Sequence, residues 1–423
     1  MLYAAAALSV ASVVVGNWQH SYSPFFLTER RSPEDFLVYY RGARAFWREH
    51  NFYETMIGVD SAGELPYSYP PSSALFFTPL AWLPSGLAWV LFEAVSLASL
   101  WWALVLTLRR CNVAAARRWA LVGLPLALWI DPVHNTFHHG QINLVLMALV
   151  LTDLWWESPR RKYLPTGVLT GAAAAVKITP AIFGLYFIAT RNWKAIGYAA
   201  GTGGLALLVA YLARPAAFTY YFTTQLGSLS GTLGPNRSSN QSARSLVVRY
   251  IAQDAQGYFT VFVTALVLAL GVAAIVRLVR AGACELAAVC TAFTGLLIAP
   301  ITWQHHYVWA VPLCILLIHA AWRNRVTWPV FDVLVYLSIS TVFIPHRHIT
   351  SSLATDPGSY SFLDIAQSSL VLWAIATLAA CCVRATDLGQ LRNDASGTPS
   401  PAPAATEREV AAALSDSKDT DRD

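Results

Sequence analysis

The sequence predicts an all-α polytopic membrane protein, a bundle of about 12 transmembrane helices with two sizeable external loops. Of its 423 residues, 56% are hydrophobic and only 13% are charged, whereas soluble domains average about 25% charged residues. A soluble protein this apolar would lack the polar residues needed to cover its surface, but a bilayer accepts apolar faces. The 16 Trp residues fit the aromatic belts that form where a membrane meets water.

Apolar segments long enough to enter a bilayer recur along the chain. The first, 1–16, lacks the basic start and the cleavage site of a signal peptide, so we interpret it as a membrane helix. The others are expected near 86–108, 119–133, 141–156, 164–177, 178–190, 195–213, 258–276, 286–302, 306–321, 326–344 and 363–383. The stretch 71–84 is apolar but rich in proline, so it is predicted to be re-entrant or interfacial.

Short basic clusters predict which way the chain faces. If the N-terminus lies inside and the spans alternate, every such cluster falls on the inner face, as the positive-inside rule requires. The clusters lie at 109–118, 158–162, 191–194, 277–280 and 323–325. The large loops 17–85 and 214–257 then face outward from the cell membrane, and both termini are cytoplasmic. Residues 1–385 form the membrane domain, and 386–423 are expected to be a disordered cytoplasmic tail because they are too polar to bury a core.

Several function classes are excluded by composition. The formal net charge is +5, but the basic residues stand in pairs at the ends of apolar segments, which sets topology and argues against nucleic-acid binding. The external loops contain no D-x-D, and the chain has no Walker loop and no G-x-G-x-x-G before a soluble helix. The six Cys residues lack zinc-like spacing. Any activated donor must therefore be one that the membrane supplies.

Asp35 is the first candidate for chemistry. It follows the first span, and it shares a helical face with Tyr39 and Gly42 because they stand at i, i+4 and i+7. A helix that starts near Ser32 would place Asp35 in its first turn, where the helix dipole favours a carboxylate. Asp35 is therefore either an acid that stabilises the helix start or a general base at the membrane surface.

Aromatic residues alternate with proline in the segment 65–71, which includes Tyr67 and Tyr69. Such a rigid, ring-lined turn can stack on a sugar or support a lipid chain. It can equally be an interfacial anchor.

Gln141 and Asn143 begin an apolar helix, and polar amides there need partners because an unpaired amide in hydrocarbon costs several kcal/mol. Lys177 lies between two short apolar segments, at the depth of the membrane. An ionisable residue there indicates a functional site, and a phosphate is a natural partner. The alternative is that Lys177 extends to the interface.

Two further polar segments face outward in the predicted topology. The first contributes Arg237, Asn240, Gln241 and, behind them, Arg244. The second contains the neighbouring residues His305 and His306. Consecutive side chains diverge on a helix, so this pair is a poor metal chelate, and a proton-handling or hydrogen-bonding role beside a substrate is favoured.

Taken in order, these segments resemble the membrane glycosyltransferases of the GT-C class, specifically family 87, formerly the DUF2029 family. The matching pieces are Asp35-Phe36 with Tyr40 and Tyr53, Tyr67 to Pro71, Pro79-Leu80, Gly140 to Asn143, Gly171 with Lys177 and Pro180, Ser239 to Ser242, and Trp303 to His306. Thr302 and Ala243 stand where the family pattern has Ser and Leu. The resemblance implies that Asp35 is the catalytic aspartate and that His305 and His306 lie near the donor.

The resemblance further implies transfer of a mannosyl residue from polyprenyl-phosphate mannose, within the membrane, to an extracytoplasmic glycolipid or glycan acceptor. In this hypothesis Asp35 takes the acceptor proton and the anomeric carbon is inverted. The leaving phosphate is already anionic, so cations stabilise it, and neither a metal nor another cofactor is expected. The candidate cations are Lys177, Arg237, Arg244, His305 and His306. The other residues expected at the donor are Tyr39, Tyr69, Gln141, Asn143, Asn240 and Gln241.

Two alternatives remain open. One is an arabinofuranosyltransferase of the same fold that uses decaprenyl-phosphate arabinose. The other is a lipid or sugar transporter or flippase, which the many spans and Lys177 would suit. The unequal external loops, the lack of an internal repeat and the surface position of Asp35 argue against transport.

Overall fold

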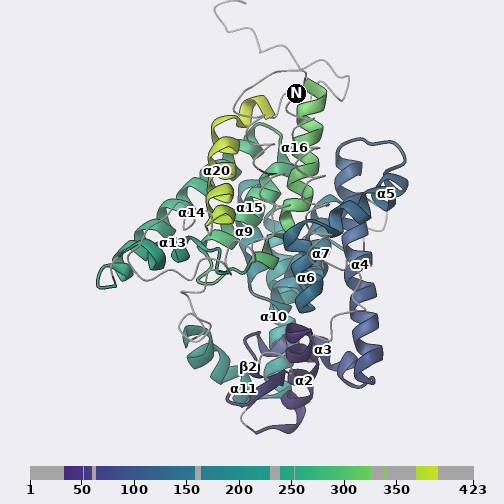
Figure 1. Ribbon diagram of the computed structural model, residues 1–423, viewed down its shortest axis with the longest axis vertical. Helices are drawn as coiled ribbons and strands as arrows, with labels where there is room; N and C mark the ends of the chain where they lie inside the picture. Colours follow the sequence, from purple (N-terminus) through teal and green to yellow (C-terminus); the bar gives the residue numbers. More distant parts are fainter. Residues whose placement is uncertain are drawn as a thin grey trace, which may run out of the picture.

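The computed structural model describes residues 33–388, apart from 51, 60–62, 158–162, 229–238, 252, 325–337 and 339–367. Most helices in this part of the chain run along the long axis of the molecule, and a smaller group gathers at one end (Figure 1). That group consists of α2, the β1–β2 hairpin, α3 and α11.

The elements follow one another as short and long helices with one hairpin. The first half contains α2 (Glu34–Arg48), β1 (Met56–Val59), β2 (Gly63–Pro66), α3 (Pro71–Ala81), α4 (Ser85–Arg110), α5 (Ala116–Leu128), α6 (Asp131–His139), α7 (Asn143–Trp155), α8 (Val168–Val176), η2 (Thr179–Ile182) and α9 (Phe183–Ala189). The second half contains α10 (Trp193–Ala213), α11 (Pro215–Tyr220), η3 (Tyr221–Gln225), α13 (Ala243–Tyr250), α14 (Gln256–Arg280), α15 (Cys284–Ile298), η4 (Gln304–Trp309), α16 (Ala310–Asn324) and α20 (Ser369–Val383).

Three described helices, α4, α10 and α14, are long and apolar enough to cross a membrane. They coincide with the expected spans 86–108, 195–213 and 258–276, which are therefore confirmed as apolar helices. Shorter apolar helices, such as α7 and α20, occupy other expected spans, so the total of about 12 spans stays a prediction. The expected spans 1–16 and 326–344 lie outside the described residues.

The hairpin β1–β2 was not predicted. It is antiparallel, with Met56 opposite Pro66 and Val59 opposite Gly63. Each strand has four residues, which is at the short end of the normal range. An alternation of apolar and polar residues over so few positions cannot be distinguished from a loop. Among the described residues, the named strands are those of this hairpin, and the other named elements are helices.

The core of the bundle forms around α15, which is buried from Leu286 to Leu297. A helix that is apolar on all sides can be buried only if neighbours surround it, and α15 packs against α14 and α20. Elsewhere α8 lies along α10, and α4 lies along α7. Packing also continues past the predicted domain boundary at 385, since Leu388 is still buried. The rest of the predicted tail lies outside the described residues.

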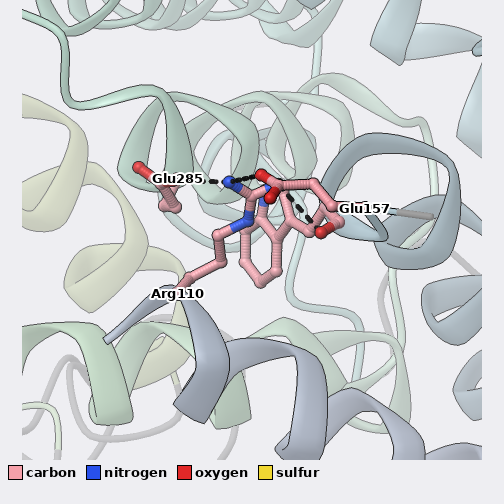
Figure 2. Close-up of polar contacts among 4 residues, drawn as sticks. Arg110, Glu157 and Glu285 are labelled. Atoms are coloured by element: carbon pink, nitrogen blue, oxygen red, sulfur yellow. Dashed lines mark hydrogen bonds and ion pairs between the residues drawn. The ribbon is translucent and has the colours of Figure 1, made fainter. Parts of the chain in front are cut away.

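An ion cluster joins three helix ends at the far end of α4 from α2 (Figure 2). Arg110 Nη1 lies 2.9 Å from Glu157 and 3.8 Å from Glu285, at the start of α15. Arg110 Nη2 also donates to the Trp155 carbonyl at 2.8 Å. The ends of α4, α7 and α15 therefore meet on one side of the bundle, and the predicted site residues of α2 lie on the other.

Candidate active site

Asp35 lies in the first turn of α2, a helix that begins directly after Pro33. The predicted helix with Asp35, Tyr39 and Gly42 at i, i+4 and i+7 is confirmed; Tyr39 and Gly42 are buried, and Asp35 is half-buried. Gly42 is required by packing, because a Cβ there would lie 2.3 Å from Cδ2 of Tyr67. This close contact draws the aromatic turn before α3 onto α2.

Gly140 brings a second segment to the start of α2. It ends α6 in the left-handed conformation, with φ of 67°, as is common for glycine after a helix. A Cβ at Gly140 would lie 2.7 Å from Cβ of Phe36 and 2.9 Å from Cζ3 of Trp89. The residues on either side of Gly140 therefore stand beside Asp35: the Gln141 amide hydrogen-bonds to its carboxylate, and His139 acts on it electrostatically.

Gln141 is held by two tyrosines. Its Oε1 accepts hydrogen bonds from the hydroxyl of Tyr39 at 2.8 Å and from that of Tyr69 at 3.4 Å. The two hydroxyls are 2.8 Å apart, and the carbonyl of Tyr69 accepts from Tyr53 at 2.8 Å. The Gln141 amide is oriented by these contacts, so its NH₂ group is directed at Asp35.

Lys177 lies at the break between α8 and η2. It is extended, with φ of −147° and ψ of 130°, and Pro180 in η2 prevents α8 from continuing. Its Nζ donates to Asn143 Oδ1 at 3.0 Å, lies 3.1 Å from His306 Nε2, and stands over the ring of Tyr69 at 5.4 Å. The break in the helix thus directs the Lys177 ammonium group towards Asn143 and His306.

The two histidines of η4 are positioned through their backbone. The carbonyl of His305 accepts hydrogen bonds from Asn143 Nδ2 and Thr136 Oγ1, both at 3.0 Å. The His305 ring lies 5.3 Å from that of His139 and 4.8 Å from that of His306. Nε2 of His305 is buried and has no hydrogen-bond partner among the described residues, so it is available to a substrate.

Asn240 and Gln241 support the histidine segment. Asn240 Oδ1 accepts from the backbone N–H of Thr302 at 3.1 Å and of Ser242 at 3.2 Å. The carbonyl of Gln241 accepts from the Tyr307 hydroxyl at 2.8 Å. These contacts fix the chain just before η4, and a direct role of Asn240 and Gln241 at the donor stays a prediction.

The predicted residues divide into three groups. The structure gathers Asp35, Tyr39, Tyr69, Gln141, Asn143, Lys177, His305 and His306. Arg244 is half-buried on α13, beyond Asn240 and Gln241. Arg237 lies outside the described residues. Sequence reasoning assigned no role to His139, although its place two residues before Gln141 in the same motif was a usable signal.

Burial raises the pKa of Asp35 above its ordinary value. His139, the hydrogen bond from Gln141 and the charge of Lys177 each lower this pKa, and Glu34 raises it. A carboxylate with a raised pKa is a stronger proton acceptor, which suits a general base. The arrangement can therefore accept a proton at Asp35 while it holds a cation close by.

A small hollow of about 40 Å³ opens beside the cation. Asn143, Lys177 and His306 line it together with apolar side chains from α7, η2 and α15. A site with a few polar groups and mostly apolar walls is typical for a ligand with one charged group and one hydrocarbon part.

A helical protein with membrane-length apolar helices that gathers a carboxylate, a lysine and histidines has the arrangement of a membrane enzyme. The family model of glycosyltransferase family 87 matches residues 67–300. The chain therefore belongs to glycosyltransferase family 87 and is a glycosyltransferase. Asp35, His305 and His306 lie outside the matched range, and their roles stay predictions.

Three relatives carry related descriptions. The chain is 31% identical over 378 residues to the polyprenol-phosphate-mannose-dependent alpha-(1-2)-phosphatidylinositol mannoside mannosyltransferase of Mycolicibacterium smegmatis, which covers 81% of this chain and 82% of the relative. It is 32% identical over 311 residues to a protein with the same description from Mycobacterium tuberculosis, with 69% and 71% covered. It is also 32% identical over 297 residues to the M. smegmatis phosphatidylinositol pentamannoside mannosyltransferase, with 67% and 69% covered. No solved structure matches.

Proposed function

We propose that this glycosyltransferase moves a mannosyl residue from polyprenyl-phosphate mannose to a glycolipid acceptor, with inversion and with Asp35 as the general base. The descriptions of the relatives support the donor and the class of acceptor. The observation that carries the mechanism is the pairing of a carboxylate, Asp35, with a cation, Lys177, across the Tyr69–Gln141 contacts.

The donor phosphate binds at Lys177, Asn143 and His306, and its prenyl chain lies along the apolar walls of the adjoining hollow. Charge-assisted hydrogen bonds from an ammonium group are the strongest contacts available to such an anion. Asn143 supports this placement because it holds the Lys177 ammonium at 3.0 Å.

The reaction is a single displacement. The acceptor hydroxyl gives its proton to Asp35 while its oxygen bonds to the anomeric carbon. The bond from that carbon to the phosphate oxygen breaks, and polyprenyl phosphate leaves with the electron pair. Lys177 stabilises the charge that collects on the phosphate. Inversion at a β-linked donor gives an α-linked product.

The site faces away from the cytoplasm in this proposal, and the chain crosses the membrane about 12 times with both termini inside. Support comes from the bundle, because Arg109, Arg110, Arg277 and Arg280 end the two spans α4 and α14 in basic residues. Asp35 lies near the opposite end of α4, where its neighbour Phe36 contacts Trp89.

The test is sugar transfer by purified protein in vesicles that contain labelled polyprenyl-phosphate mannose and a phosphatidylinositol mannoside. Asp35→Asn keeps the shape and removes the base, so transfer is expected to fall by about 10²- to 10⁴-fold. Glu49→Gln is the matched control, an exposed carboxylate at the other end of α2. Near-normal transfer by Asp35→Asn would reject the base, and a β-linked product would reject inversion.

Two arms of the same assay address the alternatives. Labelled decaprenyl-phosphate arabinose replaces the mannosyl donor in one arm, and efficient arabinosyl transfer would overturn the choice of sugar. The second arm follows movement of labelled lipid across the vesicle membrane. Movement without transfer would make the protein a transporter.

A further inference from the structure

Three arginines stand at i, i+3 and i+7 along α2, so they share one face of the helix. They are Arg41, Arg44 and Arg48, and we call them the α2 arginine row. Two hollows adjoin this row, and Arg44 lines both. The first, of about 430 Å³, lies between α2 and the start of α4 and includes Trp89. The second, of about 420 Å³, includes Trp47 and Trp82. The row therefore forms a basic wall between two open aromatic hollows.

Arg44 is fixed in place and still able to bind a ligand. Its Nε donates to the Ala81 carbonyl at 2.8 Å, and its guanidinium lies over the ring of Tyr40 at 4.6 Å. Among the described residues, its two terminal nitrogens have no acceptor and no carboxylate pairs with it. Arg44 and Arg48 are exposed. A held guanidinium with both terminal NH₂ groups to spare matches the geometry of a phosphate group.

The surroundings place this wall at headgroup depth. Trp82 is 77% exposed and Trp47 is 49% exposed. The first turns of α4, a helix able to cross a membrane, expose Leu87 and Val90. Exposed Trp and Arg beside the start of an apolar helix are typical of the interface between lipid and water. The ligand for the row is therefore the headgroup of a lipid, since a soluble anion would gain nothing from the exposed apolar surface.

The row is connected to the reacting end of α2. Phe36 lines the first hollow and adjoins Asp35 in the chain, and its contact with Gly140 separates the hollow from the active-site cluster. Asp35 and Arg44 are nine residues apart on one helix, about 14 Å along its axis at 1.5 Å per residue, and their side chains leave opposite sides of α2. A phosphodiester at Arg44 can therefore present a sugar to Asp35 only through a headgroup that extends along α2 and around its first turn.

We infer that the α2 arginine row docks the phosphodiester of an anionic glycerophospholipid, the acceptor of the proposed reaction, and directs its headgroup sugars to Asp35. The acceptor role rests on the proposed function. The lipid binding does not, and it can be measured separately.

The binding arm uses the purified full-length protein in neutral detergent, titrated with phosphatidylinositol or phosphatidylcholine, with bound lipid counted by native mass spectrometry. Wild type is expected to prefer phosphatidylinositol, and Arg44→Gln to weaken this binding about tenfold. Arg44→Lys keeps the positive charge but lacks the planar set of N–H donors of a guanidinium. Its affinity for phosphatidylinositol should lie between those of wild type and Arg44→Gln. Arg117→Gln is the matched control, an exposed arginine near the exposed Trp119 on α5, and should bind as wild type.

The transfer arm compares acceptors. Arg44→Gln should raise KM for a phosphatidylinositol mannoside about tenfold, while kcat and the KM for the donor stay within twofold. The KM for an uncharged alkyl mannoside should not rise. Equal phosphatidylinositol binding by Arg44→Gln and wild type would overturn the inference. Displacement of the lipid by inorganic phosphate would also overturn it, because the site would then serve a soluble anion.

The two proposals fail in different ways. If wild type transfers sugar to no acceptor, the proposed function fails, and the binding arm still decides whether the row is a lipid site. If Arg44→Gln does not fold, Arg48→Gln replaces it, because Arg48 is exposed and makes no hydrogen bond to the described protein.

Discussion

Replacement of Lys177 by methionine tests the phosphate site directly. Methionine keeps an unbranched side chain of similar length and removes the charge. In the wild type, Nζ lies 3.0 Å from Asn143 Oδ1 and 3.1 Å from His306 Nε2. Both contacts disappear, and with them the cation that would face the departing phosphate.

The size of the effect follows from one lost charge-assisted contact. Such a hydrogen bond contributes about 1.5–3 kcal/mol, and 1.36 kcal/mol corresponds to a tenfold change in rate. Charge on the phosphate grows as the bond to the anomeric carbon breaks. The stabilisation lost with Lys177 is therefore mainly stabilisation of the transition state. The kcat of Lys177→Met should therefore fall about 10- to 150-fold. The KM for the donor should rise less.

The assay measures initial rates of sugar transfer against donor concentration, normalised to folded protein. Lys194→Met is the matched control, because Lys194 is exposed in the first turn of α10. The Asn143 acceptor left without its donor costs about 1–3 kcal/mol of stability, which thermal denaturation records separately. A kcat within threefold of wild type would refute the assignment of Lys177 to the phosphate.

Two further predictions concern the neighbours of Asp35. Because burial raises its pKa and the base must be ionised, kcat/KM should fall as the pH drops through a value above the ordinary carboxyl range near about 4. His139→Gln removes an electrostatic interaction that lowers the pKa of Asp35, so the acid limb of the pH–rate profile should move to higher pH; an unmoved limb would contradict the contact. Gly140→Ala should destabilise the fold by at least about 1–2 kcal/mol because of its positive φ and the short contact with Phe36. Gly184→Ala, in open space, is its control in thermal denaturation and should show no loss.

Periodicity and residue chemistry predicted the parts of the site that depend on local structure. The face of α2 with Asp35 and Tyr39 follows from helical spacing, and the break at Lys177 follows from Pro180. The gathering of Gln141 and Asn143 with Lys177 was expected only because buried amides and cations require partners.

Partners distant in the chain could not be predicted. Asn240 Oδ1 binds the N–H of Thr302, 62 residues further on, and nothing near Asn240 indicates this. The interaction of His139 with Asp35 joins two different helices, so only the place of His139 in the motif before Gln141 could have indicated it. The hairpin β1–β2 was missed because four residues are too few to distinguish a strand from a loop by pattern.

Asn143 has a consequence that reaches beyond its own contacts. Its amide is planar, with one oxygen that accepts from Lys177 and one nitrogen that donates to the His305 carbonyl. The Lys177 ammonium and the His305 carbonyl are therefore held on the two sides of a single amide group. Aspartate would retain the acceptor and lose the donor, and glutamine would insert an extra methylene between the helix and both partners. Changes at position 143 and at Lys177 therefore act on one shared unit, so their energetic effects will not add.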